Sequence, residues 1–178
     1  MERLVKDVLK SKYGEVLKYA SQKHAGQFRI FGEPYIIHPL NVFLTASKFT
    51  DDQDVLQAAL LHDVVEDTDA TAEEIEQKFG SKTASLVKEL TSPAGLKHGD
   101  YSKANYLSNA VLKMSDEALL LKLCDRLDNL QQIGRFGQTR GDYLRRETRK
   151  IINTLTENRT LNQPQKTLVA EIYKQLEK

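Results

Sequence analysis

The chain has 178 residues, and its 26 Lys and Arg against 25 Asp and Glu give a net charge of +1. This balance argues against a nucleic-acid-binding or membrane-surface protein, both of which usually carry a basic excess. The length allows one domain with a sizeable core, so we expect a single domain over residues 1–178 with a small molecule as its partner. Oligomeric state is not readable from these features.

Cysteine content and apolar patterning indicate the compartment. The single cysteine, Cys124, cannot form an internal disulfide, and the first ten residues lack the apolar stretch of a signal peptide. No apolar run approaches the roughly 20 residues needed to span a bilayer. We therefore expect a soluble protein of the reducing cytoplasm, with no membrane partner.

Aliphatic residues recur at spacings of three and four along almost the whole chain, while alternating strand-like runs are nearly absent. The sequence therefore predicts an all-α fold in a single-domain helical bundle. A first helix is expected from Leu4 to about Gly26, with a bend allowed at Gly14. A second should begin at His38-Pro39, because proline is tolerated in a first turn, and end near Phe49.

Capping-box patterns mark two further helix starts, at Thr50-Asp-Asp-Gln53 and at Thr71-Ala-Glu-Glu74. Five more helical segments follow, over residues 82–90, 101–113, 116–133, 143–155 and 165–176. Turn-forming residues separate them, at positions 92–95, 115, 134–141 and 162–164.

The segment over residues 60–67 places four ionisable side chains on what otherwise has the pattern of a buried helix. Burying such groups is costly unless they are paired or bind a metal. On a helix His62 faces the same way as Glu66, and four-residue spacing likewise aligns Asp63 with Asp67. An imidazole beside a carboxylate suits a divalent metal, provided that the backbone lets the adjacent His62 and Asp63 heads converge.

Further ligands have natural donors in His38 and Asp125, which both lie beside apolar runs. Asp125 and Asn129 are four apart on a helix face separate from the apolar stripe. Each feature has a simpler interpretation: a chance His-Asp dipeptide, a helix N-cap at His38, or a surface ion pair Asp125-Arg126 worth at most about 1 kcal/mol. Their joint occurrence in the order His, His-Asp, Asp favours a metal site.

These residues match the H…HD…D signature of the HD phosphohydrolase superfamily. The segment GQFRIFGEPYIIHP (26–39) resembles the stretch before the first metal histidine in the RelA/SpoT hydrolase domain. LHDVVEDT (61–68) resembles that family's HDxxED helix, and KLCDRLDNL (122–130) its K-L-A-D-R-x-x-N segment. Over residues 19–133 the chain is thus similar to the stand-alone small alarmone hydrolases.

The resemblance implies an HD-type bundle that removes the 3′-diphosphate from (p)ppGpp, the nucleotide alarmone of the stringent response, giving GDP or GTP and pyrophosphate. It implies that His38, His62, Asp63 and Asp125 hold one divalent ion, which is Mn²⁺ in the family. Such a ligand set also accepts Fe, Co or Zn. Two alternatives stay open: a hydrolase of another nucleotide, such as a nucleoside monophosphate or NADPH, and a non-catalytic nucleotide sensor.

The same resemblance gives roles to residues around the metal. Glu66 and Asp67 would transfer a proton or orient the attacking water. Arg29 matches an arginine that contacts the substrate's phosphates, and Asn129 an asparagine near the ribose and base. Asp128 stands where the family has histidine or tyrosine, and we expect it to border the bound substrate and oppose it by charge.

Other residues match the family less specifically. Ile30 stands where bifunctional relatives usually have lysine. Lys23, Tyr35 and Arg126 are weaker candidates for substrate contacts, and a structural role is favoured for them. His24 is interpreted as a helix C-terminal residue favoured there by the helix dipole.

Overall fold

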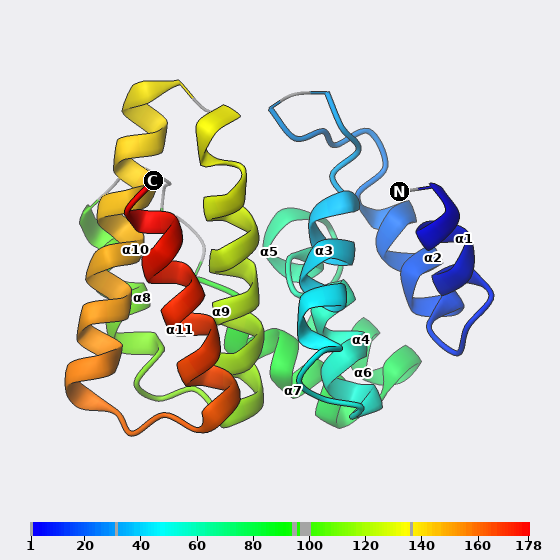
Figure 1. Cartoon of the computed structure of the whole chain (residues 1–178). Coiled ribbons are helices and arrows are strands. Elements are labelled where there is room, and N and C mark those ends of the chain that lie inside the picture. Colours follow the sequence, from blue (N-terminus) through cyan, green and yellow to red (C-terminus); the bar gives the residue numbers. More distant parts are fainter. Residues whose placement is uncertain (1, 31, 94–95, 97–100, 136) are drawn as a thin grey trace. The chain divides into compact units, whose positions relative to one another are not determined.

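The computed structural model describes residues 2–30, 32–93, 96, 101–135 and 137–178. These residues form helices joined by turns, and the described part of the chain contains no β-strand beyond one isolated bridge between Phe28 and Pro34 (Figure 1). The prediction of an all-α fold is confirmed. The chain divides into two compact units, Met1–Thr91 and Ser92–Lys178. That these units form a single domain stays a prediction.

The first unit is built around a central buried helix. Its helices are α1 (Glu2–Leu9), α2 (Gly14–Lys23), α3 (Ile37–Ala46), α4 (Gln53–Leu61), α5 (Val64–Asp67), α6 (Ala72–Phe79) and α7 (Ser81–Leu90). Helix α4 contacts α2, α3 and α7, and α6 packs against α7. Since Val55, Leu56 and every residue from Ala58 to Leu61 are buried, α4 supplies much of this unit's core.

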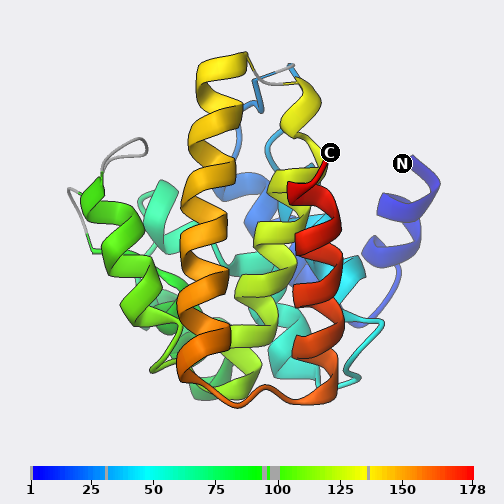
Figure 2. The same ribbon diagram turned by 60° about the vertical axis from the view of Figure 1, so that its left-hand side comes forward.

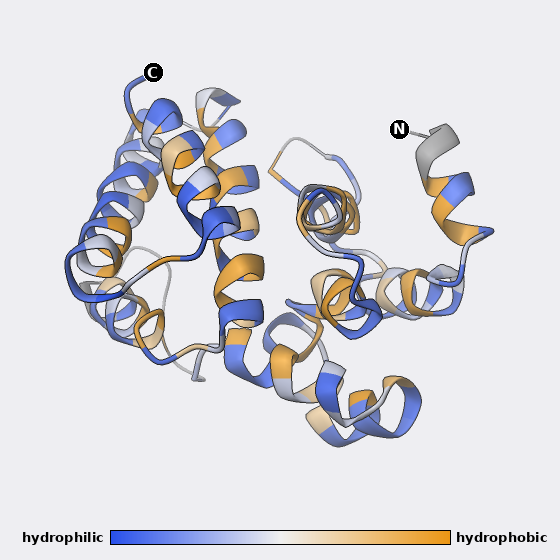
Figure 3. Ribbon diagram, turned by 60° about the horizontal axis from the view of Figure 1, so that its bottom comes forward, coloured by the Kyte–Doolittle hydropathy of each residue, from blue (hydrophilic) through white to orange (hydrophobic). Residues whose placement is uncertain are grey.

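The second unit is a bundle in which α9, α10 and α11 run side by side (Figures 1 and 2). Its elements are α8 (Tyr101–Ala110), α9 (Asp116–Gln131), the 3-10 turn η1 (Ile133–Arg135), α10 (Gln138–Asn158) and α11 (Gln163–Leu176). Helix α9 is the most buried element, and Cys124 lies in its apolar part with no exposed surface. Within each unit the hydrophobic residues gather on the sides of helices that face other helices (Figure 3).

Several helix boundaries differ from those predicted. The expected first helix is two helices, α1 and α2, because the chain turns so tightly between them that a Cβ on Gly14 would lie 2.2 Å from the carbonyl oxygen of Leu9. Helix α10 begins at Gln138, so part of the predicted 134–141 loop is helical. Of the predicted break at 92–95, residues 94 and 95 lie outside the described residues.

Capping explains where two helices of the first unit begin. Thr71 caps α6 as predicted, since its hydroxyl accepts a hydrogen bond from the Glu74 amide at 3.2 Å. The predicted cap at Thr50 is wrong by two residues. Asp52 caps α4 by accepting from the amides of Asp54 and Val55, because a carboxylate oxygen satisfies two orphan donors at once.

In the part of the chain that the structure describes, no helix combines the length and the apolar composition needed to cross a lipid bilayer.

Candidate metal centre

The His62-Asp63 pair lies where α4 ends and α5 begins. His62 is the C-cap of α4, and Asp63 is the residue before α5. The backbone of Asp63 has φ −100° and ψ −6°, which lies outside the core of the helical region and ends α4. The prediction of an uninterrupted helix through this segment is therefore wrong. The break lets the two adjacent side chains point to one place.

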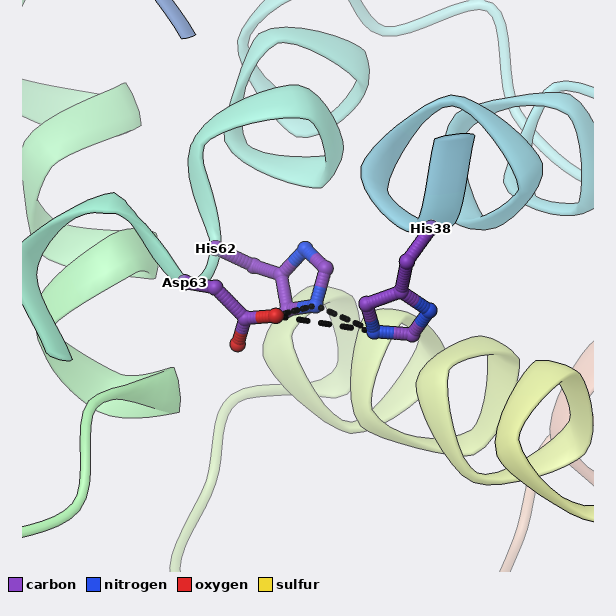
Figure 4. Close-up of side chains that lie close together, drawn as sticks. All are labelled: His38, His62 and Asp63. Carbon is purple, nitrogen blue, oxygen red and sulfur yellow. Dashed lines mark hydrogen bonds and ion pairs between the residues drawn. The ribbon is translucent and has the colours of Figure 1, made fainter. Parts of the chain in front are cut away.

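Three of the four predicted ligands converge in the first unit (Figure 4). The Nε2 atom of His62 lies 3.3 Å from Nε2 of His38, which comes from the first turn of α3. The Oδ2 atom of Asp63 lies 3.1 Å from Nε2 of His62 and 3.5 Å from Nε2 of His38. One ligand atom from each residue therefore lies within 4.8 Å of the others.

The hydrogen bonding of His62 shows that this donor set fits a cation. Its Nδ1 lies 2.9 Å from the carbonyl oxygen of Ala59, which can only accept, so Nδ1 carries the proton. In the neutral ring Nε2 then presents its lone pair to His38 and Asp63. Both histidines are buried, with exposed fractions of 3% for His38 and 2% for His62. The Nε2 lone pair of His62, beside the Asp63 carboxylate and the His38 imidazole, suits a divalent metal ion.

A tyrosine hydroxyl joins this cluster to the predicted catalytic carboxylate Asp67. The Tyr35 hydroxyl donates to Oδ2 of Asp63 at 2.6 Å and lies 3.2 Å from Oδ2 of Asp67. Loss of solvent around Asp67 and the charge of Asp63 raise the pKa of the Asp67 carboxyl, while the bond from Tyr35 opposes this shift. Glu66 is partly buried on the same short helix. The catalytic roles of Glu66 and Asp67 stay predictions.

The fourth predicted ligand, Asp125, lies in the second unit on α9. Its Oδ1 accepts from Nδ2 of Asn129 at 2.6 Å, and its Oδ2 accepts from Nζ of Lys122 at 3.2 Å. Asp125 and Asn129 therefore share a helix face, as their spacing predicted. Asp125 as a ligand and Asn129 as a substrate contact stay predictions.

Comparison with known proteins assigns the chain to a family. Residues 16–160 match the family model described as HD domain. The chain belongs to the HD domain family. It is 42% identical over 127 residues to the Drosophila melanogaster guanosine-3′,5′-bis(diphosphate) 3′-pyrophosphohydrolase MESH1, a match that covers 69% of this chain and 70% of that protein.

Other relatives and one solved structure agree with this assignment. A guanosine-3′,5′-bis(diphosphate) 3′-pyrophosphohydrolase of Aquifex aeolicus is 41% identical over 135 residues, which are 75% of this chain and 19% of that protein. The chain thus spans about a fifth of the length of several curated relatives. A structure described as a metazoan ortholog of SpoT that hydrolyzes ppGpp superimposes with a TM-score of 0.79 at 34% identity, covering 93% of this chain and 96% of that one.

In this HD domain, Arg29 belongs to a narrow loop that precedes the first metal-site histidine. The amide of Arg29 donates to the carbonyl of Glu33 at 2.8 Å, and the loop turns at Gly32, whose φ of 79° favours glycine. Phe28 and Ile30, on either side of Arg29, are 64% and 52% exposed. Arg29 itself is partly buried, and its role as a phosphate contact stays a prediction.

Two buried charges on α9 of the HD domain differ from what the sequence suggested. Arg126 is not in a surface ion pair: it is buried, and its Nη1 lies 2.6 Å from Oε2 of Glu147. Burial alone would lower the pKa of Arg126, but the charges of Glu147 and Asp125 outweigh it and raise the pKa above its usual value. This burial and ion pair agree with a structural role for Arg126. Asp128 is also buried, with 3% exposed, and its role toward substrate stays a prediction.

Proposed function

We propose that this chain is a metal-dependent hydrolase that removes the 3′-diphosphate from ppGpp and pppGpp, leaving GDP or GTP and pyrophosphate. The observation that carries this proposal is the convergence of His38, His62 and Asp63 in a chain of the HD domain family. The names of the relatives support the substrate. The Drosophila relative carries most weight because the match covers most of both proteins.

The metal we propose is a single Mn²⁺ ion, held by His38, His62 and Asp63 with Asp125 as the predicted fourth ligand. A divalent ion bound there makes a water molecule more acidic and offsets negative charge on the phosphate. Two imidazoles and carboxylates also accept Fe, Co or Zn, so supply and geometry decide the occupant.

The chain's own residues then handle the proton and the substrate. The water oxygen bonds to the phosphorus next to the ribose, the bond from that phosphorus to the 3′ oxygen breaks, and pyrophosphate leaves whole. Glu66 or Asp67 takes the water's proton, and the raised pKa of Asp67 makes its carboxylate a stronger base than an ordinary aspartate. The 3′ oxygen of the ribose gains a proton as the bond breaks.

Substrate binding is assigned to side chains that are not themselves metal ligands. The Arg29 guanidinium offers paired N–H donors to phosphate oxygens, and Asn129 can donate to and accept from the nucleoside. We place the reaction in the cytoplasm, where a single cysteine stays reduced.

Product analysis tests this function. The Mn²⁺-loaded protein is incubated separately with ppGpp, GMP and NADPH, and products are identified by anion-exchange chromatography and ³¹P NMR. The proposal expects GDP and pyrophosphate from ppGpp alone. Release of orthophosphate, or turnover of GMP or NADPH in preference to ppGpp, would point to another HD-type hydrolase, and binding without turnover to a sensor. The His62→Ala protein, purified in parallel, controls for a contaminating phosphatase.

A further inference from the structure

Behind the candidate metal centre, a buried histidine holds the ring of Tyr35. His24 is the C-cap of α2, so its predicted position at a helix end is confirmed. Its side chain is buried, with 3% of the residue exposed. Its ring centroid lies 4.8 Å from that of Tyr35, with the planes tilted by 37°. The Tyr35 ring also meets the His38 ring edge-on, with centroids 5.9 Å apart. The tyrosine therefore packs against both a helix end and a candidate ligand.

Gln27 fixes the backbone around the same tyrosine. Its Nε2 donates to the carbonyl oxygen of Asp67 at 2.8 Å, so its Oε1 faces the Nδ1 of His24, also at 2.8 Å. Because Oε1 can only accept, this His24 nitrogen carries the proton. The carbonyl of Gln27 accepts from the amide of Tyr35 at 3.0 Å. One residue thus ties the Tyr35 backbone to the end of α5.

The Tyr35 hydroxyl ends this set of contacts at two carboxylates. It lies 2.6 Å from Oδ2 of Asp63, the same oxygen that faces both imidazoles, and 3.2 Å from Oδ2 of Asp67. Two carboxylates this close to one hydroxyl repel each other, and the hydroxyl proton between them reduces this repulsion. The ring alone would fill the space, but only the hydroxyl part of the Tyr35 side chain can hydrogen-bond to the carboxylates.

We propose that Tyr35 is a positioning residue whose hydroxyl orients the candidate ligand Asp63 and the candidate catalytic residue Asp67 relative to each other. The inference rests on the proposed function for its effect on turnover. Its effect on metal binding is independent of the substrate. Partners that orient metal ligands through a hydrogen bond typically change affinity or activity by about 10- to 100-fold when removed.

The test is Tyr35→Phe, which keeps the ring and its packing and deletes the hydroxyl. Mn²⁺ affinity of metal-stripped protein is measured by calorimetry, and steady-state kinetics are measured with ppGpp. We expect the Kd for Mn²⁺ to rise by about 10-fold, and kcat to fall by about 10-fold or more with KM nearly unchanged. The matched control is Tyr173→Phe, which deletes a hydroxyl bonded to Asn153 in the second unit and should change neither value.

An unchanged Kd together with an unchanged kcat overturns the proposal. If the wild-type protein hydrolyses no ppGpp, the proposed function fails, while the Mn²⁺ affinity still decides whether Tyr35 orients Asp63. A double-mutant cycle decides the second contact: Tyr35→Phe should lower kcat much less in an Asp67→Asn background than in wild type. Fully additive effects would contradict the link to Asp67. Thermal unfolding of each variant shows whether a change in fold accounts for the result.

Discussion

The cluster of His38, His62 and Asp63 in the first unit (the metal-site cluster, our candidate site) and the Arg126–Glu147 pair of the second both bring polar side chains together in the interior, but with different partners. Arg126 donates to Glu147 at 2.6 Å, and the hydroxyl of Tyr143 donates to the other carboxylate oxygen at 2.9 Å. In the metal-site cluster, by contrast, two imidazole nitrogens and a carboxylate oxygen face one another. The Glu147 carboxylate is thus held by two donors of the protein, whereas imidazole nitrogens gathered around a carboxylate oxygen are the ligands that suit a divalent cation.

Asp125 is a predicted metal ligand, but its hydrogen bonds resemble those of Glu147 more than those of the metal-site cluster. Both of its oxygens have donors, Nζ of Lys122 and Nδ2 of Asn129, so the side chain is satisfied without a metal. A cation at Asp125 has to compete with the Lys122 ammonium for the same oxygen. These two contacts are therefore those of a carboxylate held by donors of its own helix, whereas His62 Nε2 faces another imidazole and a carboxylate.

The largest effect is expected from His62→Ala. Removing one imidazole from the metal-site cluster should abolish ppGpp hydrolysis, because the remaining ligands hold the ion weakly. In the metal-free protein, His62→Ala should change the free energy of unfolding far less than the loss of one partner of the buried Arg126–Glu147 pair does. Turnover assays and urea unfolding check both statements, and hydrolysis near the wild-type rate would remove His62 from the site.

Changes to the Arg126–Glu147 pair should alter the free energy of unfolding rather than turnover. Arg126→Met leaves the Glu147 carboxylate buried without its cation, and we expect the free energy of unfolding to fall by about 3–5 kcal/mol. The double variant Arg126→Met, Glu147→Leu should recover most of this loss, because neither charge is then buried alone. Urea denaturation measures both. A loss under about 1 kcal/mol in the single variant would mean that water reaches Glu147.

Glu66→Gln should lower turnover without loss of the metal, an effect smaller than that of His62→Ala. The change keeps the shape of the side chain but removes a proton acceptor, so we expect kcat to fall by about 100-fold while Mn²⁺ stays bound. Steady-state kinetics with a parallel metal analysis provide the measurement. A kcat within a few-fold of wild type would leave Asp67 as the remaining candidate base.

The smallest effect is expected from Asp128→Asn. Asp128 follows Asp125 by three residues on α9, and its charge should oppose an anionic substrate by about 1 kcal/mol or less. KM for ppGpp should therefore fall several-fold while kcat hardly moves. A rise in KM would instead favour Asp128 as an acceptor for the N–H groups of guanine. Because Asp128 is buried, urea unfolding of the variant serves as the control.

Much of the fold was readable from the sequence because hydrophobic spacing sets helices directly. Thr71 was identified as a cap from its pattern alone, and α11 begins within two residues of the expected position. The cap of α4 shows where sequence patterns stop being decisive. Thr50, Asp51 and Asp52 can each cap a helix, and the backbone conformation of the folded chain makes Asp52 the cap. Gly141 favoured a loop, yet it lies within α10 and is buried there.

For the site, the motif predicted that His38, His62 and Asp63 gather, but not how the backbone brings them together. The break at Asp63 that lets His62 and Asp63 converge depends on tertiary packing around a four-residue helix. Burial of His24 against Tyr35 joins residues eleven apart across a loop, so no local periodicity reports it. Glu147 was missed as the partner of Arg126 because the two are 21 residues apart on different helices.

The central claim is that the cluster of His38, His62 and Asp63 binds a divalent ion. It is tested most directly by metal stoichiometry. Protein stripped with a chelator is dialysed against Mn²⁺, and bound metal is counted by elemental analysis for wild type and for Asp63→Ala. We expect about one ion per chain in wild type and far less in the variant. Equal metal content in the two proteins would contradict the account, because the ion would then be held elsewhere.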